Sequence, residues 1–256
     1  MSEQDSARPT TATLPYETDP RLHRLLILAD GVFAISLTLL AVQLALPEGS
    51  QDLRGEALLP ALLATWPRVL AYANSFAVIA IFWQAHHRLF LQVRRFDGIL
   101  LWLVFLQLGC IGFIPFPTAV IGEHGTNPVA QQFYLATLLA SSLAWVLLRW
   151  YATAGHRLVG PDLSSGDLRF YLRNSVAAPV VFVVLMALTA LGVGRLIDPL
   201  LVVYFLALVY IALSSLRYTW EERQEVLEAA EEGGPKSTPG KEQLANKEDG
   251  KEGQDE

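Results

Sequence analysis

Two charged residues stand at the start of a long apolar stretch, where an unpaired charge is energetically costly. Arg24 and Asp30 are six residues apart, and no charged residue follows Asp30 before Val42. An ionisable side chain inside a membrane segment usually faces the interior of a helix bundle and finds a partner there. A spacing of six does not place two side chains next to each other on one helix. We therefore expect another helix to supply a partner for Asp30.

A polar residue lies within an apolar stripe on the same stretch. Ile35, Thr38, Leu39 and Val42 follow the spacing i, i+3, i+4, i+7, so they share one face of a helix. Such a stripe fits a packing face between helices as well as the wall of a pore. The Thr38 hydroxyl could also bond a backbone carbonyl one turn earlier. The residues alone leave these alternatives open.

Two adjacent histidines follow a tryptophan in the second apolar stretch. Adjacent residues such as His86 and His87 point about 100° apart on a helix, and no carboxylate follows them at a metal-ligand spacing. We predict a structural role, with Trp83 nearby: one imidazole bonds toward Asp30 or Arg24, and the other faces an interface. Because histidine titrates near neutrality, a pH response stays open.

Enzyme and metal-site motifs are missing from the sequence. It has no glycine-rich phosphate loop, no H-E-x-x-H and no nucleophile elbow. The single cysteine, Cys110, cannot form an intrachain disulfide, and no Cys/His spacing suggests zinc. The basic residues are scattered rather than clustered as a nucleic-acid footprint. We predict that the protein is not an enzyme and has no cofactor, bound metal or nucleic-acid partner.

The elements that must position these residues are membrane-spanning helices. The chain is 52% hydrophobic and only 17% charged, whereas soluble domains carry about a quarter charged residues. A bilayer core needs roughly 20 apolar residues per helix, and hydrocarbon requires that backbone groups bond within the span. We predict an all-α integral membrane bundle of six helices in the lipid bilayer. The predicted spans are Leu22–Leu46, Leu59–Phe82, Ile99–Ile121, Val129–Trp150, Leu172–Gly192 and Leu196–Leu216.

The arginines predict how the bundle is oriented, because basic residues stay on the cytoplasmic side. Eleven arginines fall in segments on one side of the predicted spans and three on the other, and an even number of spans then places both termini in the cytoplasm. The first group is Arg21, Arg24, Arg88, Arg94, Arg95, Arg149, Arg157, Arg169, Arg173, Arg217 and Arg223, and the second is Arg54, Arg68 and Arg195.

Composition divides the chain into three parts. Residues 1–20 are polar and contain three prolines, so we expect a disordered segment. Residues 21–220 form the membrane domain. Residues 221–256 are rich in Glu, Lys and Gly with almost no aromatic residues, which predicts a charged and mostly disordered tail.

Three stretches of the sequence resemble a known family, the transmembrane protein 175 potassium channels. The family begins its first span with R-x-x-x-F-S-D, and this chain has R-x-x-x-L-A-D from Arg24 to Asp30, with Leu28 and Ala29 in place of Phe and Ser. The similarity covers the first three spans, and the last three match in number and hydropathy. The other two similar stretches are Ser75-Phe76 with Trp83–Arg88, and Phe113–Thr118 with Gly122-Glu123.

The resemblance implies a potassium channel without the T-V-G-Y-G carbonyl filter, which this sequence lacks. It implies a homotetramer in a prokaryotic cell membrane, in which the first spans surround a path for passive K⁺ flow. Ile35 would form the narrowest ring, and Leu39 and Val42 would extend the apolar wall. Thr38 would favour K⁺ over Na⁺. Arg24 and Asp30 would be structural supports that hold the first helix against the second and third.

Two other functions remain open from the sequence. A secondary transporter would carry substrate-binding polar groups at mid-membrane, and few polar residues lie there. A membrane scaffold would assemble with a sealed centre and conduct nothing. Within the channel interpretation, protons could pass through the same path.

Overall fold

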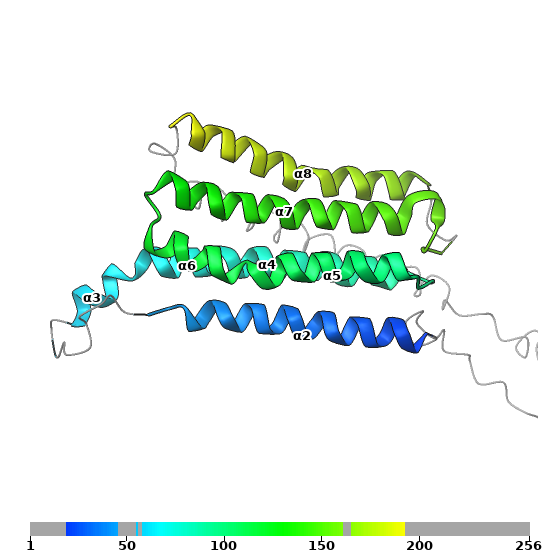
Figure 1. The fold of residues 1–256 in the computed structure, drawn as a ribbon, viewed down its shortest axis with the longest axis horizontal. Coiled ribbons are helices and arrows are strands. Elements are labelled where there is room, and N and C mark those ends of the chain that lie inside the picture. The colour runs from blue at the N-terminus through cyan, green and yellow to red at the C-terminus, as the bar shows by residue number, and fades with distance from the viewer. Residues whose placement is uncertain (1–18, 46–54, 56–57, 161–164, 193–256) are drawn as a thin grey trace, which may run out of the picture. The chain divides into compact units, whose positions relative to one another are not determined.

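The computed structural model describes residues 19–45, 55, 58–160 and 165–192 as a set of helices (Figure 1). Within these residues the only strand-like contact is an isolated antiparallel bridge between Val93 and Val159. The helices are α2 (Pro20–Val42), α3 (Leu58–Ala64), α4 (Trp66–Gln92), α5 (Gly98–Phe113), α6 (Pro115–Glu123), α7 (Pro128–Thr153), the short 3-10 helix η2 (Ala154–His156) and α8 (Ser165–Ala190).

Five helical segments of the described residues are long and apolar enough to cross a membrane. They are α2, α4, α5 with α6, α7 extended to His156, and residues 172–190 of α8. The mainly helical membrane architecture predicted from the sequence is thus confirmed for these spans. The predicted sixth span, Leu196–Leu216, lies outside the described residues, as do nearly all of the predicted N-terminal segment and the predicted tail.

The second span differs from its predicted bounds, Leu59–Phe82. The short helix α3 ends at Ala64, and α4 begins at Trp66 and continues ten residues beyond Phe82 to Gln92. Pro67 in the first turn explains the restart, because proline has no N–H to continue the preceding helix. His86 and His87 therefore lie inside α4 and not after it.

The third span is divided by prolines. Helix α5 ends at Phe113, and α6 restarts with Pro115, followed by Pro117. Neither proline has an N–H, so the carbonyls one turn earlier lose their helical partners. Beyond the break, α6 packs mainly against α4 and α7.

Side-chain caps fix where three of the long helices begin. Asp19 accepts from the Arg21 amide at 2.9 Å, Asp97 from the Leu100 amide at 2.7 Å, and Asn127 from the Val129 amide at 2.9 Å. A capping oxygen satisfies one of the free amides in the first turn. These caps place the helix ends at the edges of the apolar stretches.

Helix α2 lies along one side of the bundle, against α4, α5 and α6, while α7 packs against α5 and α6 and carries α8 on its other side (Figure 1). The inner face of α2 is part of the common hydrophobic core. It contributes Leu22, Leu25, Ala29, Phe33 and Leu40, all at most 4% exposed. One face of α2 is therefore fixed by packing.

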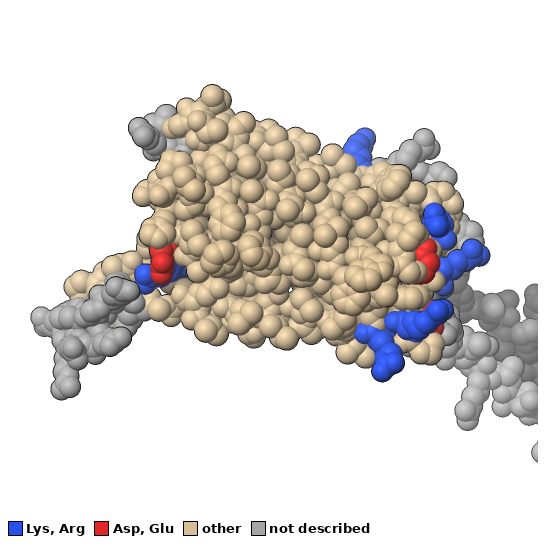
Figure 2. Space-filling view, in the orientation of Figure 1, with Lys and Arg blue, Asp and Glu red and all other residues tan. Residues whose placement is uncertain are grey.

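Most basic side chains gather at one end of the bundle (Figure 2). At this end the loop after α4 is joined to the loop after α7, because the Arg94 amide donates to the Leu158 carbonyl at 2.7 Å. Asp97 accepts from the Tyr151 hydroxyl and lies 3.9 Å from Arg157. Partial burial raises the pKa of Asp97, but these partners and the Leu100 amide outweigh it and hold the pKa below its usual value.

Candidate functional site

The stripe on α2 lies on the outer face of the subunit. Ile35 is 60% exposed, Leu39 44% and Val42 77%, and Thr38 between them is also exposed. None of these side chains is packed into the core of its own subunit. The stripe is therefore available to a neighbouring chain, to lipid or to a central path.

The outer face of α2 differs from those of α4 and α5 because its exposed large hydrophobic side chains include no aromatic residue. Its exposed large side chains are aliphatic, with small residues such as Gly31 and Ala34 between them. On α4 and α5, by contrast, exposed aromatic side chains include Trp66, Phe76, Trp102 and Phe105. Small residues let helices approach closely in a membrane, so the outer face of α2 is suited to contact with other helices.

The Thr38 hydroxyl donates to the Ile35 carbonyl at 2.8 Å, the backbone bond considered from the sequence. A hydroxyl has one hydrogen and two acceptor lone pairs. The bond uses the hydrogen, so the oxygen keeps its acceptor capacity on an exposed face. Ser36 makes the equivalent bond to the Val32 carbonyl at 2.7 Å, but it is 1% exposed and faces the core.

Asp30 finds its interhelical partner on α4. The Trp83 indole N–H donates to Asp30 Oδ1 at 2.9 Å, and the His87 ring stacks on the indole with centroids 5.6 Å apart and planes at 17°. The expectation of a partner from another helix is confirmed, and the donor is the indole rather than an imidazole. This contact ties the middle of α2 to α4.

The His86 ring lies inside the core rather than beside Asp30. It is 2% exposed and packs between Phe33 of α2 and Phe90, with centroids 5.6 Å and 4.5 Å away. Its Nε2 atom has no hydrogen-bond partner among the described residues. The predicted bond from His86 toward Asp30 or Arg24 is not formed, because the ring sits inside an aromatic part of the core.

Arg24 is exposed on the outer side of α2. It lies eleven residues before Ile35, about three turns of helix, and so on nearly the same face as the stripe. In the described part of the chain no hydrogen bond or ion pair joins it to α4, α5 or α6. The structure places Arg24 and Asp30 on different sides of α2.

A buried chain of hydrogen bonds joins α4, α6 and α7. Thr118 donates to the Ile114 carbonyl at 2.8 Å, so the bond of 2.7 Å between Ser75 and Thr118 must take its hydrogen from Ser75. Tyr134 then donates to Ser75 at 2.9 Å, and Asn74 Nδ2 donates to Tyr134 at 3.3 Å. All four side chains are at most 4% exposed. Polar bonds of this kind hold membrane helices together.

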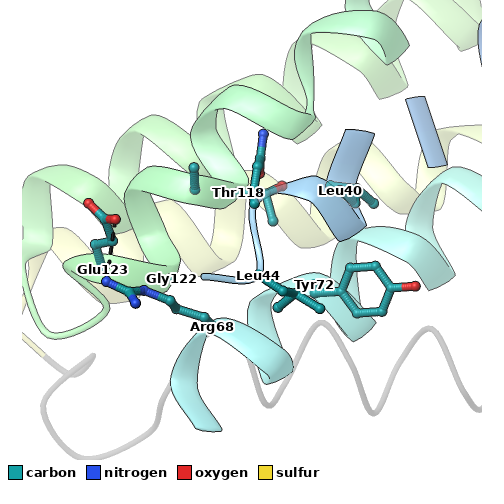
Figure 3. A pocket seen from close by; sticks show the side chains of 9 residues that line it. Leu40, Leu44, Arg68, Tyr72, Thr118, Gly122 and Glu123 are labelled. Carbon is teal, nitrogen blue, oxygen red and sulfur yellow. Dashed lines mark hydrogen bonds and ion pairs between the residues drawn. The ribbon is translucent and has the colours of Figure 1, made fainter. Parts of the chain in front are cut away.

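The chain just after α2 is held by a residue that the sequence analysis counted only among the three arginines of the less basic side. Arg68 of α4 donates to the Ala45 carbonyl at 2.7 Å and pairs with Glu123 of α6 at 3.4 Å (Figure 3). The sequence pattern at Gly122-Glu123 marked the right region but not this partner. Tyr134 and Asn74 were also missed, since a polar residue in an apolar run does not reveal its neighbour.

The described residues contain no group of three or more His, Cys, Asp or Glu that could hold a metal ion. The site is therefore a helix face with its supports.

The sequence model of one protein family, described as endosomal/lysosomal potassium channel TMEM175, matches residues 24–115. A potassium channel of Chamaesiphon minutus is 31% identical over 190 residues, which are 73% of this chain and 91% of the relative. The chain belongs to the TMEM175 family.

Other TMEM175 proteins and structures agree with this assignment. A potassium channel of Streptomyces collinus is 36% identical over 56% of this chain and 73% of its own length. The human endosomal/lysosomal proton channel TMEM175 is 38% identical over 50% of this chain, but only 27% of its own length is matched. The crystal structure of the Chamaesiphon minutus homologue, described as lysosomal potassium-selective channel TMEM175 homolog, superposes with a TM-score of 0.65 over 77% of this chain and 99% of that chain, at 29% identity.

The family-like stretches meet as contacts between helices in this TMEM175 chain. Asp30 from the first stretch bonds Trp83 from the second. Ser75 from the second bonds Thr118 from the third. The residues that carried the resemblance are thus mainly those that fix how the first three spans pack.

Replacing Trp83 with phenylalanine tests the contact to Asp30. Trp83→Phe keeps an aromatic ring and removes the N–H, so we expect a loss of about 1–2 kcal/mol in stability, within the range for polar contacts between membrane helices. The unfolding midpoint in detergent, at fixed protein concentration, measures it. Trp102→Phe on α5 is the matched control, because this 71% exposed indole has no hydrogen bond among the described residues. Equal midpoints for the two variants would contradict a stabilising role for the Asp30 bond.

Proposed function

We propose that this protein is a potassium-permeable channel, in which K⁺ flows passively along a path lined by the outer face of α2. The observation that carries the proposal is the exposure of Ile35, Thr38, Leu39 and Val42 on a face that the subunit itself does not cover. Membership of a family whose bacterial relatives are named potassium channels supports the same function.

A path of this kind requires several copies of α2, because one helix cannot enclose a pore. We propose a homotetramer with four α2 helices around the axis. The small residues Gly31 and Ala34 on the outer face of α2 support this arrangement, since close helix contact in membranes depends on small residues. The copies are the only protein partners that the path requires.

Ile35 would form the narrowest ring, with Leu39 and Val42 continuing the apolar wall for about 10 Å along the helix. An apolar ring narrower than a hydrated ion gates by dewetting, so a small change of diameter changes conduction steeply. Thr38 would place hydroxyl oxygens beside the ion. Because the hydroxyl hydrogen already bonds the Ile35 carbonyl, each Thr38 oxygen can coordinate the cation without the hydroxyl group having to reorient.

Arg24 and Asp30 take different roles in this arrangement. Asp30, bonded to Trp83, supports the position of α2. His87 stacks on the Trp83 indole, and His86 is buried in the core next to α2. Arg24 lies on nearly the same face as the stripe, toward the basic end of the bundle. By the positive-inside rule this end faces the cytoplasm, in a prokaryotic cell membrane, with both termini on that side of a six-span subunit.

Flux measurements in liposomes test the channel. Purified protein should pass K⁺ down its gradient without ATP, and a pH-sensitive dye would report whether protons follow the same path. Uptake that saturates and requires a coupled substrate would instead indicate a secondary transporter. Complete absence of flux from a correctly assembled protein would indicate a non-conducting scaffold.

Ile35→Asn tests the apolar ring. An amide side chain binds water and so wets the ring. We therefore expect higher K⁺ flux, by about tenfold for each 1.4 kcal/mol by which the free-energy barrier to ion passage falls. Ile35→Leu, which keeps the ring apolar, should change the flux little. If both variants conduct like the wild type, Ile35 does not form the constriction.

Thr38→Ala tests selectivity. Loss of the hydroxyl should lower the K⁺ to Na⁺ flux ratio by roughly two- to tenfold, which corresponds to one hydrogen-bond-sized interaction of about 0.5–1.5 kcal/mol. Ser36→Ala is the matched control: it removes a hydroxyl of the same helix that faces the core and should leave the ratio unchanged. An unaltered ratio in Thr38→Ala would place selectivity elsewhere.

A further inference from the structure

We propose that Arg68 is a positioning residue for the conduction path: it holds the last turn of α2, and with it Leu39 and Val42, through a contact that we call the α2 latch (Arg68, Ala45, Gly122 and Glu123). This inference rests on the proposed channel function. The latch lies at the end of the bundle opposite the basic end, and Figure 3 shows the Arg68 side chain reaching toward Glu123 beside Leu44.

On the α2 side, the latch acts on backbone that has just left the helix. Helix α2 ends at Val42, and turn bonds from Leu44 to Ala41 and from Ala45 to Gln43 follow it. The Ala45 carbonyl accepts from Arg68 Nη1 at 2.7 Å. A bond from an ionised donor is about twice as strong as a neutral one, and a positive group near the C-terminal end of a helix is favourable.

On the α6 side, Glu123 orients the guanidinium. Its carboxylate lies 3.4 Å from Arg68 Nη2, and the Glu123 side chain is 55% exposed while that of Arg68 is 23% exposed. Exposed ion pairs stabilise little by themselves. The role of Glu123 is therefore secondary: it holds the second nitrogen of Arg68 while the first nitrogen binds α2.

Gly122 makes this geometry possible. A Cβ atom at Gly122 would lie 3.3 Å from the Arg68 Cα and 3.4 Å from its Cγ, tighter than ordinary contacts. The absence of a side chain lets α6 approach α4 at Arg68. The approach brings the Glu123 carboxylate within reach of the guanidinium.

The latch acts directly on the turn that carries the outer part of the apolar wall. In this turn Leu40 is 1% exposed and packs into the core, while Leu39 and Val42 point outward. The recess behind the turn has about 20 Å³ of free space, room for about one water molecule. The inner side of this turn is thus nearly filled, and a released turn has more space on its exposed face, toward the path.

Replacing the latch residues one at a time and together, with flux measured in liposomes, tests this proposal. Arg68→Gln should lower K⁺ flux, because Leu39 and Val42 then move into the path, and should also lower the K⁺ to Na⁺ ratio, by roughly fivefold or more, a usual size for coupling between sites. Glu123→Gln should act in the same direction but less. Adding Glu123→Gln to Arg68→Gln should change nothing further, because Glu123 acts only through Arg68.

Arg157→Gln is the matched control, because it removes an ion pair at the other end of the bundle and should leave both readouts unchanged. If Arg68→Gln behaves like this control while the wild type conducts, the latch proposal is wrong and the channel remains. Additive effects of the two latch variants would also overturn it. If Arg68→Gln does not assemble, Glu123→Gln serves as the test: an unchanged K⁺ to Na⁺ flux ratio in this variant overturns the latch proposal. A wild type that passes no ions refutes the channel itself.

Discussion

Helices in a membrane are not pressed together by the hydrophobic effect, because lipid tails are as apolar as leucine side chains. This constraint makes the polar contacts of α2 decisive. Its inner face fits the core by shape, and two bonds hold it, one near its middle and one just past its C-terminal end: Asp30 to Trp83, and Ala45 to Arg68. About 20 Å of helix lies between them, and that length carries the stripe from Ile35 to Val42. The position of the stripe thus depends on two bonds to α4.

Helix α4 can serve as a support because it is fixed in turn. The directed chain from Asn74 through Tyr134 and Ser75 to Thr118 ends at the Ile114 carbonyl, next to the break between α5 and α6. Two prolines lie at that break, and the helix α6 that follows it carries both Thr118, which bonds Ser75, and Glu123, which pairs with Arg68. Helix α6 is therefore part of how the first span is held.

Much of the fold could be predicted from the sequence, and the limits were local. Apolar length located five spans of the described residues, but it merged α3 with the start of α4, since hydropathy does not register a restart at Pro67. The motif ending in Asp30 predicted a partner on another helix, but it could not show whether the donor is the indole of Trp83 or one of the imidazoles beside it. Arg68 was counted only among the arginines of the less basic side, because its partners lie 23 and 55 residues away along the chain.

The sequence by itself determined the periodicity of α2, the sorting of arginines and the need of Asp30 for a partner, because these follow from residue spacing and the cost of charge in hydrocarbon. Only the tertiary structure decided which face of α2 is covered and which donor reaches Asp30. These facts depend on how helices far apart in the chain are rotated against each other, and spacing within one helix carries no information about that rotation.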